Sequence, residues 1–331
     1  MIENDKIFMR RAIELARHGL GNVSPNPMVG AVIVNKGKII GEGYHRRWGE
    51  AHAEVNAINS VSDKAQLTNS TIYITLEPCS HFGKTPPCAK LLIDSGIRKV
   101  AIGCLDPYKE VSGRGVAMLR NAGVEVITGI LEDECLQLNK AFITAHTLQR
   151  PYITLKWAQS TDGFIDRKRE PSDKPTLFSN AITSTLAHRL RSLNDAILVG
   201  SGTVIYDNPS LNVRFWPGQS PIRIALDYRQ RISATSKIND TAIAPTLILH
   251  PESHMLDSTL HDLYNQGITS LLVEGGASLL QSFINQGTWD LARVETSPVI
   301  LYDGVKSPVL NAKCFHSLKI GENTIDYYIP D

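Results

Sequence analysis

The chain has 331 residues, of which 42% are hydrophobic and 20% charged, and its formal net charge is +1. These values are typical of a soluble protein of about two domains and exclude a strongly basic face for nucleic acid. No apolar stretch approaches the roughly 20 residues of a membrane span, and the N-terminus lacks a secretion signal. The odd number of cysteines, five, argues against a disulfide framework. We therefore expect a cytoplasmic protein that binds neither nucleic acid nor membranes.

The first half of the chain alternates between predicted strands and helices. An amphipathic N-terminal helix precedes a β-hairpin whose turn is Lys36-Gly37. The elements expected after it are a helix from residue 51, a strand over 71–76, a helix over 88–96, a strand over 98–106, a helix over 113–123, a strand over 124–130 and a polar helix over 131–148. This alternation predicts a layered α/β domain.

The same alternation restarts after Arg150-Pro151. Strands are expected over 151–159, 195–200, 221–227, 246–250 and 270–276, and a helix over 277–287 that ends at Gly287. The sequence thus predicts two α/β domains, residues 1–147 and 148–331.

A histidine and two cysteines in the first half have the pattern of a catalytic zinc site. His52 and Glu54 stand at a helix start, Cys79 follows a strand, and Cys88 begins another helix, where the dipole favours a thiolate. One imidazole and two thiolates suit tetrahedral Zn²⁺ with the fourth position open for water. Glu54 would then move protons without binding the metal, as in zinc deaminases of nucleobases.

A structural zinc module without chemistry is the competing interpretation of these residues. It predicts four protein ligands and no role for Glu54. A third interpretation, a buried structural cysteine pair with a surface histidine, does not account for the order of strand, hairpin and helix starts.

These residues also resemble a known family. His52-Ala53-Glu54 and the run from Pro78-Cys79-Ser80-His81 to Pro86-Pro87-Cys88 closely resemble the bacterial deaminase/reductase family of riboflavin biosynthesis. Shorter segments resemble that family's substrate-lining parts: Ser24 to Gly30, Gly41 to His45, Asp106-Pro107 and Gly113 to Gly115. The resemblance implies a cytidine-deaminase-like three-layer domain followed by a dihydrofolate-reductase-like domain.

The resemblance implies two reactions on one small molecule. The first domain would use Zn²⁺ to hydrolyse the 2-amine of 2,5-diamino-6-(ribosylamino)-4(3H)-pyrimidinone 5′-phosphate, and the second would use NADPH to reduce the ribosyl side chain to ribityl. By the family pattern, Asn26 would contact the pyrimidine and His45 would lie near the pocket. His81 and Lys84, on the loop between the cysteines, are candidates for the substrate phosphate.

In the second half, two strand–glycine–helix junctions are candidate phosphate sites. Gly200-Ser201-Gly202 follows a strand, but Ile205 stands where a dinucleotide fingerprint has its third glycine. Gly275-Gly276 presents N–H donors at a helix start. The resemblance assigns the cofactor to Ala158, Thr203, Asp207, Gly276, Ala277, Ser278 and Leu279, and the substrate to Arg191, Leu211, Arg214 and Glu274.

Three further residues are candidates on weaker grounds. Lys156 lies on the opening strand of the second domain, close to Ala158. NADPH needs a positive group for its 2′-phosphate, and Arg229 or Arg231 is our hypothesis for that group.

The second half also departs from the family pattern. Leu177-Phe178-Ser179-Asn180 stands where Trp-Ile-Thr-Gly is common, Tyr228 stands where serine is usual, and residues 295–331 match poorly. A deaminase whose second half binds nucleotide without reducing it is therefore the alternative function. We further expect a homo-oligomer formed through the second half.

Overall fold

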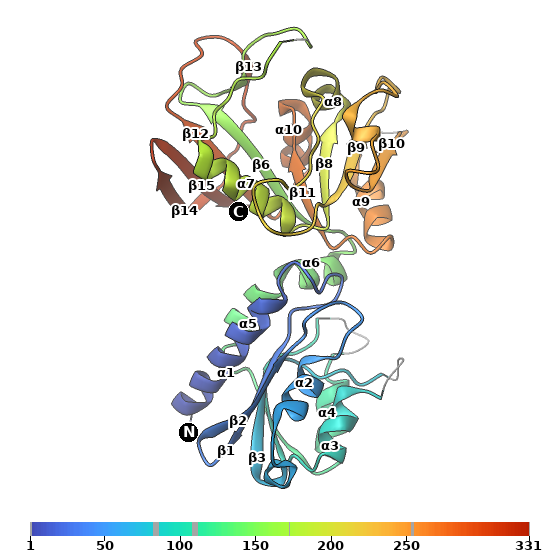
Figure 1. Cartoon of the computed structure of the whole chain (residues 1–331), viewed down its shortest axis with the longest axis vertical. Helices are drawn as coiled ribbons and strands as arrows, with labels where there is room; N and C mark the ends of the chain where they lie inside the picture. Colours follow the sequence, from blue (N-terminus) through green and yellow to red (C-terminus); the bar gives the residue numbers. More distant parts are fainter. Residues whose placement is uncertain (1, 82–85, 108–111, 172, 253–254, 331) are drawn as a thin grey trace. The chain divides into compact units, whose positions relative to one another are not determined.

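The computed structural model divides into two compact units, Met1–Leu148 and Gln149–Asp331 (Figure 1). The structure describes residues 2–81, 86–107, 112–171, 173–252 and 255–330. The sequence placed the division between residues 147 and 148, one position earlier. None of the helices in these ranges combines the length and the apolar character needed to cross a bilayer.

The first unit is built on a five-stranded sheet with the order β2-β1-β3-β4-β5. Its strands are β1 (Gly30–Asn35), β2 (Lys38–Tyr44), β3 (Ser70–Leu76), β4 (Lys99–Cys104) and β5 (Glu125–Thr128). The predicted hairpin is present, because β1 and β2 pair antiparallel around Lys36-Gly37. Strands β3, β4 and β5 run parallel, so their carboxyl ends meet at one edge of the sheet.

Helices cover both faces of this sheet and make three layers. They are α1 (Ile2–Ala16), η1 (Arg17–Gly19), α2 (Ala53–Ser60), η2 (Lys64–Asn69), α3 (Cys88–Asp94), α4 (Arg114–Asn121), α5 (Glu132–Leu138) and α6 (Lys140–Leu148). Ala31 and Ile33 of β1 pack in one apolar cluster with residues of α2, α3 and α4. Val32 and Val34 pack in the other with residues of α1 and α5. The period-two alternation of one strand thus fills both cores.

The polar helix predicted over residues 131–148 is wrong in one respect, because the segment forms two helices that break at Asn139. The side chain of Asn139 is buried. Its Oδ1 accepts the N–H of Met28 at 2.8 Å, and its Nδ2 donates to the Met28 carbonyl at 2.9 Å. A contact across 111 residues overrides the local pattern that favoured one helix.

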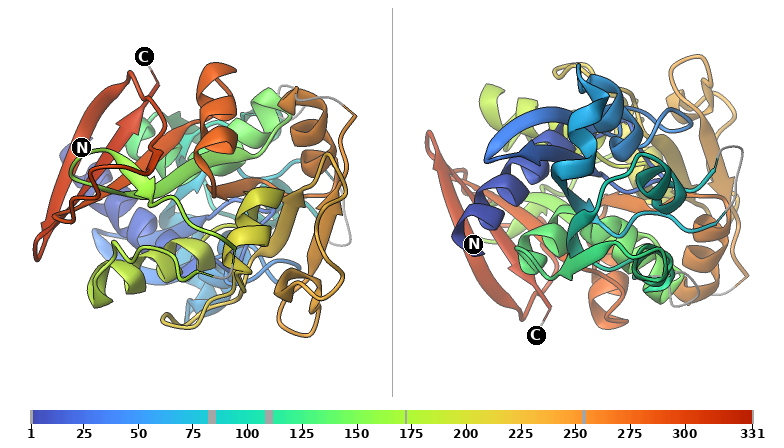
Figure 2. Two further views of the ribbon diagram at one scale, coloured as in Figure 1. Left: turned by 90° about the horizontal axis from the view of Figure 1, so that it is seen from above. Right: turned by 90° about the horizontal axis from the view of Figure 1, so that it is seen from below.

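The second unit contains an eight-stranded sheet with the order β10-β9-β8-β11-β6-β12-β15-β14. Its strands are β6 (Tyr152–Ser160), β8 (Ala196–Gly200), β9 (Ile222–Leu226), β10 (Thr246–Leu249), β11 (Ser270–Glu274), β12 (Leu291–Ser297), β14 (Lys313–Ile320) and β15 (Asn323–Ile329). The strands from β10 to β12 are parallel, and β15 and β14 continue antiparallel as a hairpin at the sheet edge (Figure 2). A small separate sheet pairs β7 (Phe164–Asp166) with β13 (Val305–Lys306).

Helices lie on both faces of the large sheet as well. They are α7 (Ala181–Ser192), α8 (Ser201–Asp207), η3 (Lys237–Asn239), α9 (Leu256–Asn265) and α10 (Ala277–Asn285). Residues of α9 and α10 pack with Leu155 and Trp157 of β6. The opposite face carries Lys156 and Ala158, and α7 and α8 flank it.

Candidate active sites

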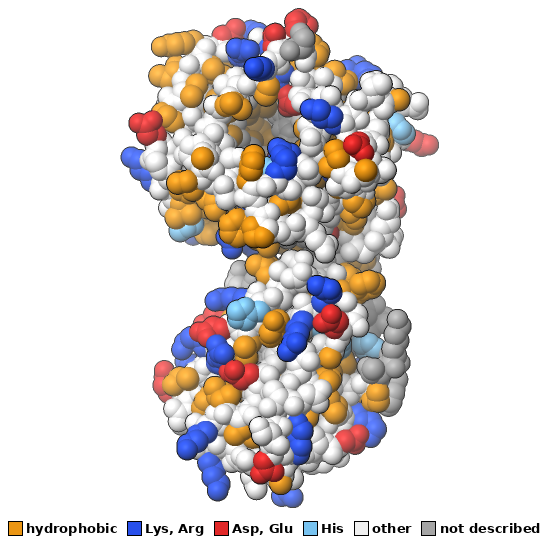
Figure 3. Space-filling view, viewed as in Figure 1, with side chains coloured by type: hydrophobic (Ala, Val, Ile, Leu, Met, Phe, Trp, Pro, Cys, Tyr) orange, Lys and Arg blue, Asp and Glu red, His pale blue; other side chains and the backbone are white. Residues whose placement is uncertain are grey.

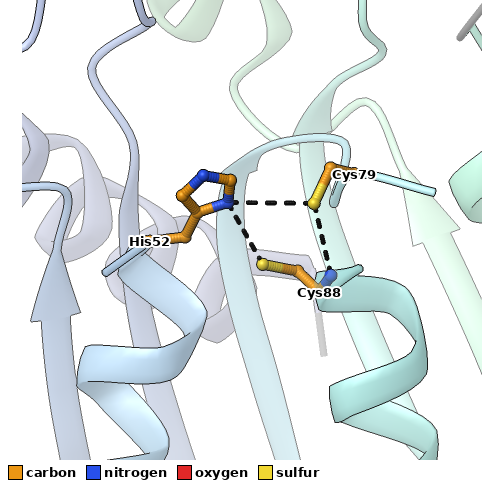
Figure 4. Close-up of side chains that lie close together, drawn as sticks. All are labelled: His52, Cys79 and Cys88. Carbon is orange, nitrogen blue, oxygen red and sulfur yellow. Dashed lines mark hydrogen bonds between the residues drawn. The ribbon is translucent and has the colours of Figure 1, made fainter. Parts of the chain in front are cut away.

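His52, Cys79 and Cys88 converge in the first unit as the sequence predicted (Figure 4). Their ligand atoms all lie within 4.8 Å of one another. The Nδ1 atom of His52 is 3.3 Å from Sγ of Cys88 and 3.8 Å from Sγ of Cys79. Three soft or borderline donors at these distances fit one Zn²⁺ ion and provide only three of its four ligands.

Backbone geometry places these three side chains. His52 is the residue before α2 and makes no side-chain cap, so its ring is free to face the cysteines. Cys88 is the first residue of α3, and its N–H donates to Sγ of Cys79 at 3.2 Å. A hydrogen bond from Cys88 lowers the pKa of Cys79 to about 4, although burial opposes it. Cys79 therefore favours the thiolate, which is the form that binds metal, whereas its hydrogen bond raises the pKa of Cys88.

Glu54 lies in the first turn of α2 and is only 3% exposed. Burial raises the pKa of its carboxyl group, and a hydrogen bond with Cys88 opposes this effect. A buried carboxyl group beside the three ligands has the place and the ionisation of a general acid/base.

Asn26 and His45 lie against the same site. The amide Nδ2 of Asn26 is 3.2 Å from Nε2 of His45, and Nδ1 of His45 is 3.1 Å from the Ala51 carbonyl. Because that carbonyl only accepts, His45 carries its proton on Nδ1 and accepts from Asn26 with Nε2. Burial lowers the pKa of His45, and its ring stands edge-on to His52 at 5.5 Å. The two residues predicted to line the pyrimidine pocket thus adjoin the metal ligands.

Glu77 was missed by the sequence interpretation. Its buried carboxylate accepts N–H groups of Asp106 at 3.2 Å, Gly113 at 2.9 Å and Val116 at 3.1 Å. These bonds tie the start of α4 to the segment that leads into Cys79. No local motif signals this role, since the partners lie 29 to 39 residues away.

The two loop candidates for the substrate phosphate remain predictions. His81 is exposed, and Lys84 lies outside the described residues.

The second unit contains a cavity of about 550 Å³ on the α7 and α8 face of its sheet, and Figure 3 shows this unit hollowed on the visible face. The predicted residues that line it are Lys156, Ala158, Arg191, Thr203, Asp207, Leu211, Glu274 and Gly276. Cofactor and substrate candidates therefore share one cavity. Ala277, Ser278 and Leu279 follow Gly276 as the first turn of α10 and are not among the described residues that line the cavity.

Ion pairs hold the charged side chains of this cavity. Arg191 of α7 meets Glu274 of β11 twice, at 2.7 Å and 3.1 Å. Burial would raise the pKa of Glu274, but the charges of Arg191 and Lys156 lower it to about 2. Burial lowers the pKa of Lys156, its partner in the neighbouring strand. The floor of the cavity thus holds an ionised carboxylate beside a lysine that releases its proton easily.

The glycine turn after β11 fits a dinucleotide. Oγ1 of Thr203 accepts the N–H of Gly276 at 3.0 Å, and a Cβ at Gly275 would approach the same oxygen to 3.1 Å. The residue before α10 is Gly276, which provides no side-chain cap, so the helix start remains open to a phosphate. Leu211 on the cavity wall has a φ of 52°, which is uncommon for leucine.

The remaining arginine candidates are exposed and are not among the residues that line the cavity in the described part of the chain. Arg214 is exposed, and its backbone N–H donates to Nδ1 of His188 at 3.0 Å. Partial burial lowers the pKa of its guanidinium, and the charge of Arg191 lowers it further. Arg231 is exposed, and its Nη2 lies 3.3 Å from Oγ of Ser201 at the start of α8. Arg229 is exposed as well.

Arg169 is a cavity residue that the sequence interpretation missed. Its side chain is only 4% exposed, and it forms ion pairs with Asp166 at 2.6 Å and with Asp207. In sequence it belongs to the run Arg167-Lys168-Arg169-Glu170, which has the pattern of a solvated surface segment. Only the fold shows that one member of the run is buried.

Comparisons with known proteins decide the family. Residues 2–104 match the model of the cytidine and deoxycytidylate deaminase zinc-binding region, and residues 151–325 match that of the RibD C-terminal domain. The chain is 39% identical over 345 residues to riboflavin biosynthesis protein RibD of Aquifex aeolicus, a match that covers 98% of this chain and 96% of that protein. The chain belongs to the RibD family.

Other RibD relatives agree. RibD of Escherichia coli is 38% identical over 90% of this chain and 88% of its own. A solved deaminase/reductase of Thermotoga maritima is 36% identical, with a TM-score of 0.90 and coverage of 100% and 99%. RibD of Acinetobacter baumannii is 31% identical, with a TM-score of 0.90 over the whole of both chains.

The RibD family has two activities in one chain. This protein is accordingly a bifunctional deaminase and reductase of riboflavin biosynthesis, with a zinc-dependent deaminase domain and an NADPH-dependent reductase domain. The predicted fold classes of both domains, both activities and both cofactors are confirmed at this level.

Proposed function

We propose that the first unit hydrolyses the 2-amine of 2,5-diamino-6-(ribosylamino)-4(3H)-pyrimidinone 5′-phosphate and that the second reduces the ribosyl group of the product. The Thermotoga maritima relative is described as a diaminohydroxyphosphoribosylaminopyrimidine deaminase and 5-amino-6-(5-phosphoribosylamino)uracil reductase. The observation that carries the proposal is the buried Glu54 beside His52, Cys79 and Cys88.

In the deaminase unit, each side chain has a distinct task. Zn²⁺, when bound, is a Lewis acid that lowers the pKa of a coordinated water. Glu54 accepts a proton from the attacking water and returns it to the departing amine, which its buried carboxyl group suits. Asn26 and His45 orient the pyrimidine by hydrogen bonds from the adjoining wall. The 2-amine leaves as ammonia and the ring gains a carbonyl.

In the reductase unit, the side chains position the ring-opened substrate and supply a proton. NADPH, when bound, supplies the hydride that reaches C1 of the ribose. Lys156 donates a proton to the nitrogen of the same C=N bond, so the imine becomes an amine. Glu274 and Arg191 fix the substrate from the cavity floor, and Arg191 and Arg214 attract its phosphate.

Thr203, Asp207 and the glycine turn would hold the cofactor. Thr203 and Asp207 line the cavity together with Gly276. We assign the 2′-phosphate to Arg229 or Arg231, since both are exposed and Arg231 reaches the start of α8. Charge reversal at both positions should weaken NADPH and leave NADH affinity unchanged.

The departures from the family pattern do not close the cavity. The side chain of Leu177 is 83% exposed, and Tyr228 packs against the apolar core on the other face of the sheet. Phe178 lies on the cavity wall. These departures therefore give no structural reason for the loss of reduction.

We also propose a cytoplasmic homo-oligomer that associates through the second unit. All residues of β14 except Ile320 are exposed, including Phe315 at 52% and Leu318 at 38%. Such an apolar edge strand favours pairing with another copy. The five cysteines are all free, as expected in a reducing compartment. Sedimentation of L318E should show dissociation, and an unchanged mass would refute this interface.

The proposal is tested by mass spectrometry of the product formed from the diaminopyrimidine ribosylamino phosphate with Zn²⁺ and NADPH. A product that is both deaminated and reduced is expected. A deaminated but unreduced product would keep the zinc assignment and refute the reductase assignment. No conversion would refute the substrate.

A further inference from the structure

Arg293 of β12 is buried next to the reductase cavity, and the terminal nitrogens of its guanidinium are unpaired within the described residues. Its side chain is 2% exposed, and neither Nη1 nor Nη2 has a hydrogen-bond partner among the described residues. An unpaired guanidinium in the interior is costly unless its charge serves another group.

The sheet register places this guanidinium beside Lys156. Arg293 pairs with Lys156 across β12 and β6, and Lys156 pairs with Glu274 across β6 and β11. Residues in register on parallel strands project from the same face, with strands about 4.8 Å apart. Glu274, Lys156 and Arg293 therefore form one row beneath the cavity.

The two carboxylates that act on Lys156, Glu274 and Glu295, are engaged elsewhere. Both oxygens of Glu274 accept from Arg191. Those of Glu295, which is completely buried, accept from Ser179 at 2.9 Å and from Asn323 at 2.6 Å. Arg293 is thus left as a cation that faces another cationic group.

We propose that Arg293 is a positioning residue of the reductase site and acts on the substrate through Lys156 without touching a ligand. This inference rests on the proposed proton donation by Lys156. A fixed positive charge beside an amine disfavours the ammonium form, so it makes Lys156 a stronger acid. Once Lys156 has donated its proton, its amine is neutral and takes up a proton from solvent before the next turnover.

Several groups face Lys156 and share in setting its ionisation. Arg191 and His188 face it from α7, Glu274 from β11, and Arg293 and Glu295 from β12. After burial, Arg191 and Arg293 lower the pKa of Lys156, while Glu274 and Glu295 raise it. Because Glu274 and Arg191 form their own pair, Arg293 is the cation in this set that forms no ion pair within the described parts of the chain.

The test measures the pH titration of the Lys156 amine in the whole chain by NMR of ¹⁵N-labelled lysine side chains. The Lys156 signal is assigned by its absence in K156M. R293M should move the titration midpoint to higher pH by about one unit, and R293K should keep most of the original value. The alkaline limb of the pH profile of reductase kcat/KM should move in the same direction. Deaminase activity of the same chain should not change.

A structural role makes different predictions. R293M removes no hydrogen bond of the terminal nitrogens, so its midpoint of thermal unfolding should stay or rise, whereas a structural arginine would lower it. If R293M does not fold, E295Q gives the converse measurement and should move the Lys156 midpoint to lower pH. An unchanged titration midpoint of Lys156, or a raised KM for substrate or NADPH with an unshifted pH profile, would overturn the role of Arg293. Full reductase activity in K156M would instead refute the proposed role of Lys156 itself.

Discussion

The two sites of this protein are assembled in opposite ways. In the deaminase unit, the metal ligands and Glu54 lie within residues 52–88 and are placed by two helix starts and the end of one strand. In the reductase unit, the cavity residues extend from Lys156 to Val305 and come from several strands and helices. The first site is defined by short motifs and the second by the topology of the sheet.

The balance of charge differs in the same way. The first site offers one histidine and two cysteines to a cation, and the buried Glu54 lies beside them. The second site balances its charges internally, with Arg191 against Glu274 and Arg169 against Asp166 and Asp207. We therefore expect the first site to lose its activity when a single group or the metal ion is removed. The second site should lose activity and stability when one partner of an ion pair is removed, because the other charge is then left buried.

The largest effect is expected for E54Q. The amide cannot move the proton, so deamination should fall by about 10² to 10⁴-fold, while zinc content and reduction of pre-formed deaminated substrate should be unchanged. Both half-reactions and the metal content are measured on one preparation. The matched control is E134Q, an exposed glutamate of the same unit, which should behave as wild type. Normal deamination in E54Q would refute the role of Glu54 as the general acid/base of the deaminase.

Removal of zinc should distinguish the two activities as clearly as E54Q does. A chelator should abolish deamination and leave the reductase rate unchanged, because the reductase residues contain no His/Cys metal cluster within the described part of the chain. Addition of Zn²⁺ should restore deamination. Parallel loss of reductase activity would show that the units are not independent.

E274Q should break the internal balance of the second site. It leaves the guanidinium of Arg191 buried without its carboxylate, which costs about 3–5 kcal/mol in the free energy of unfolding for a buried pair. The rate of reduction should fall. Deamination should persist at temperatures at which the second unit is still folded. Denaturant unfolding and both assays measure this, with the exposed E322Q as control.

The same pair predicts a pH dependence of stability. The pKa of Glu274 is lowered to about 2 in the folded chain. Its contribution is therefore complete above its unfolded pKa of about 4.3 and is lost as the pH falls toward 2. Wild type should lose more stability than E274Q across this window, and equal losses would contradict the assignment.

A smaller effect is expected for R169Q. Loss of its ion pairs frees Asp207, the proposed cofactor contact, so KM for NADPH should rise several-fold while kcat changes little. Steady-state kinetics with varied NADPH measures this. K90Q breaks an exposed pair in the first unit and should leave KM unchanged; an equal rise there would show a nonspecific effect.

The sequence was most informative where contacts are local. The Lys36-Gly37 turn and the helix start at Cys88 follow from residues within one turn of the feature. The break at Asn139 does not, since its partner Met28 is 111 positions away.

The same limit applies to the sites. His52, Glu54 and Cys79 could be predicted from motifs. Glu77 and Arg293 could not, because their roles depend on loop contacts and strand register that no local pattern specifies. Arg169 stands in a charged run and becomes a cavity residue only through the fold.

The most direct test of two independent sites is to mix E54Q chains with K156M chains and to follow the deaminated and reduced product by mass spectrometry. Each variant alone should form almost none of it from the diaminopyrimidine substrate. The mixture should form it readily, because K156M chains deaminate and E54Q chains reduce the released intermediate. A mixture no better than its components, with each half-reaction intact, would contradict the account of two separable sites.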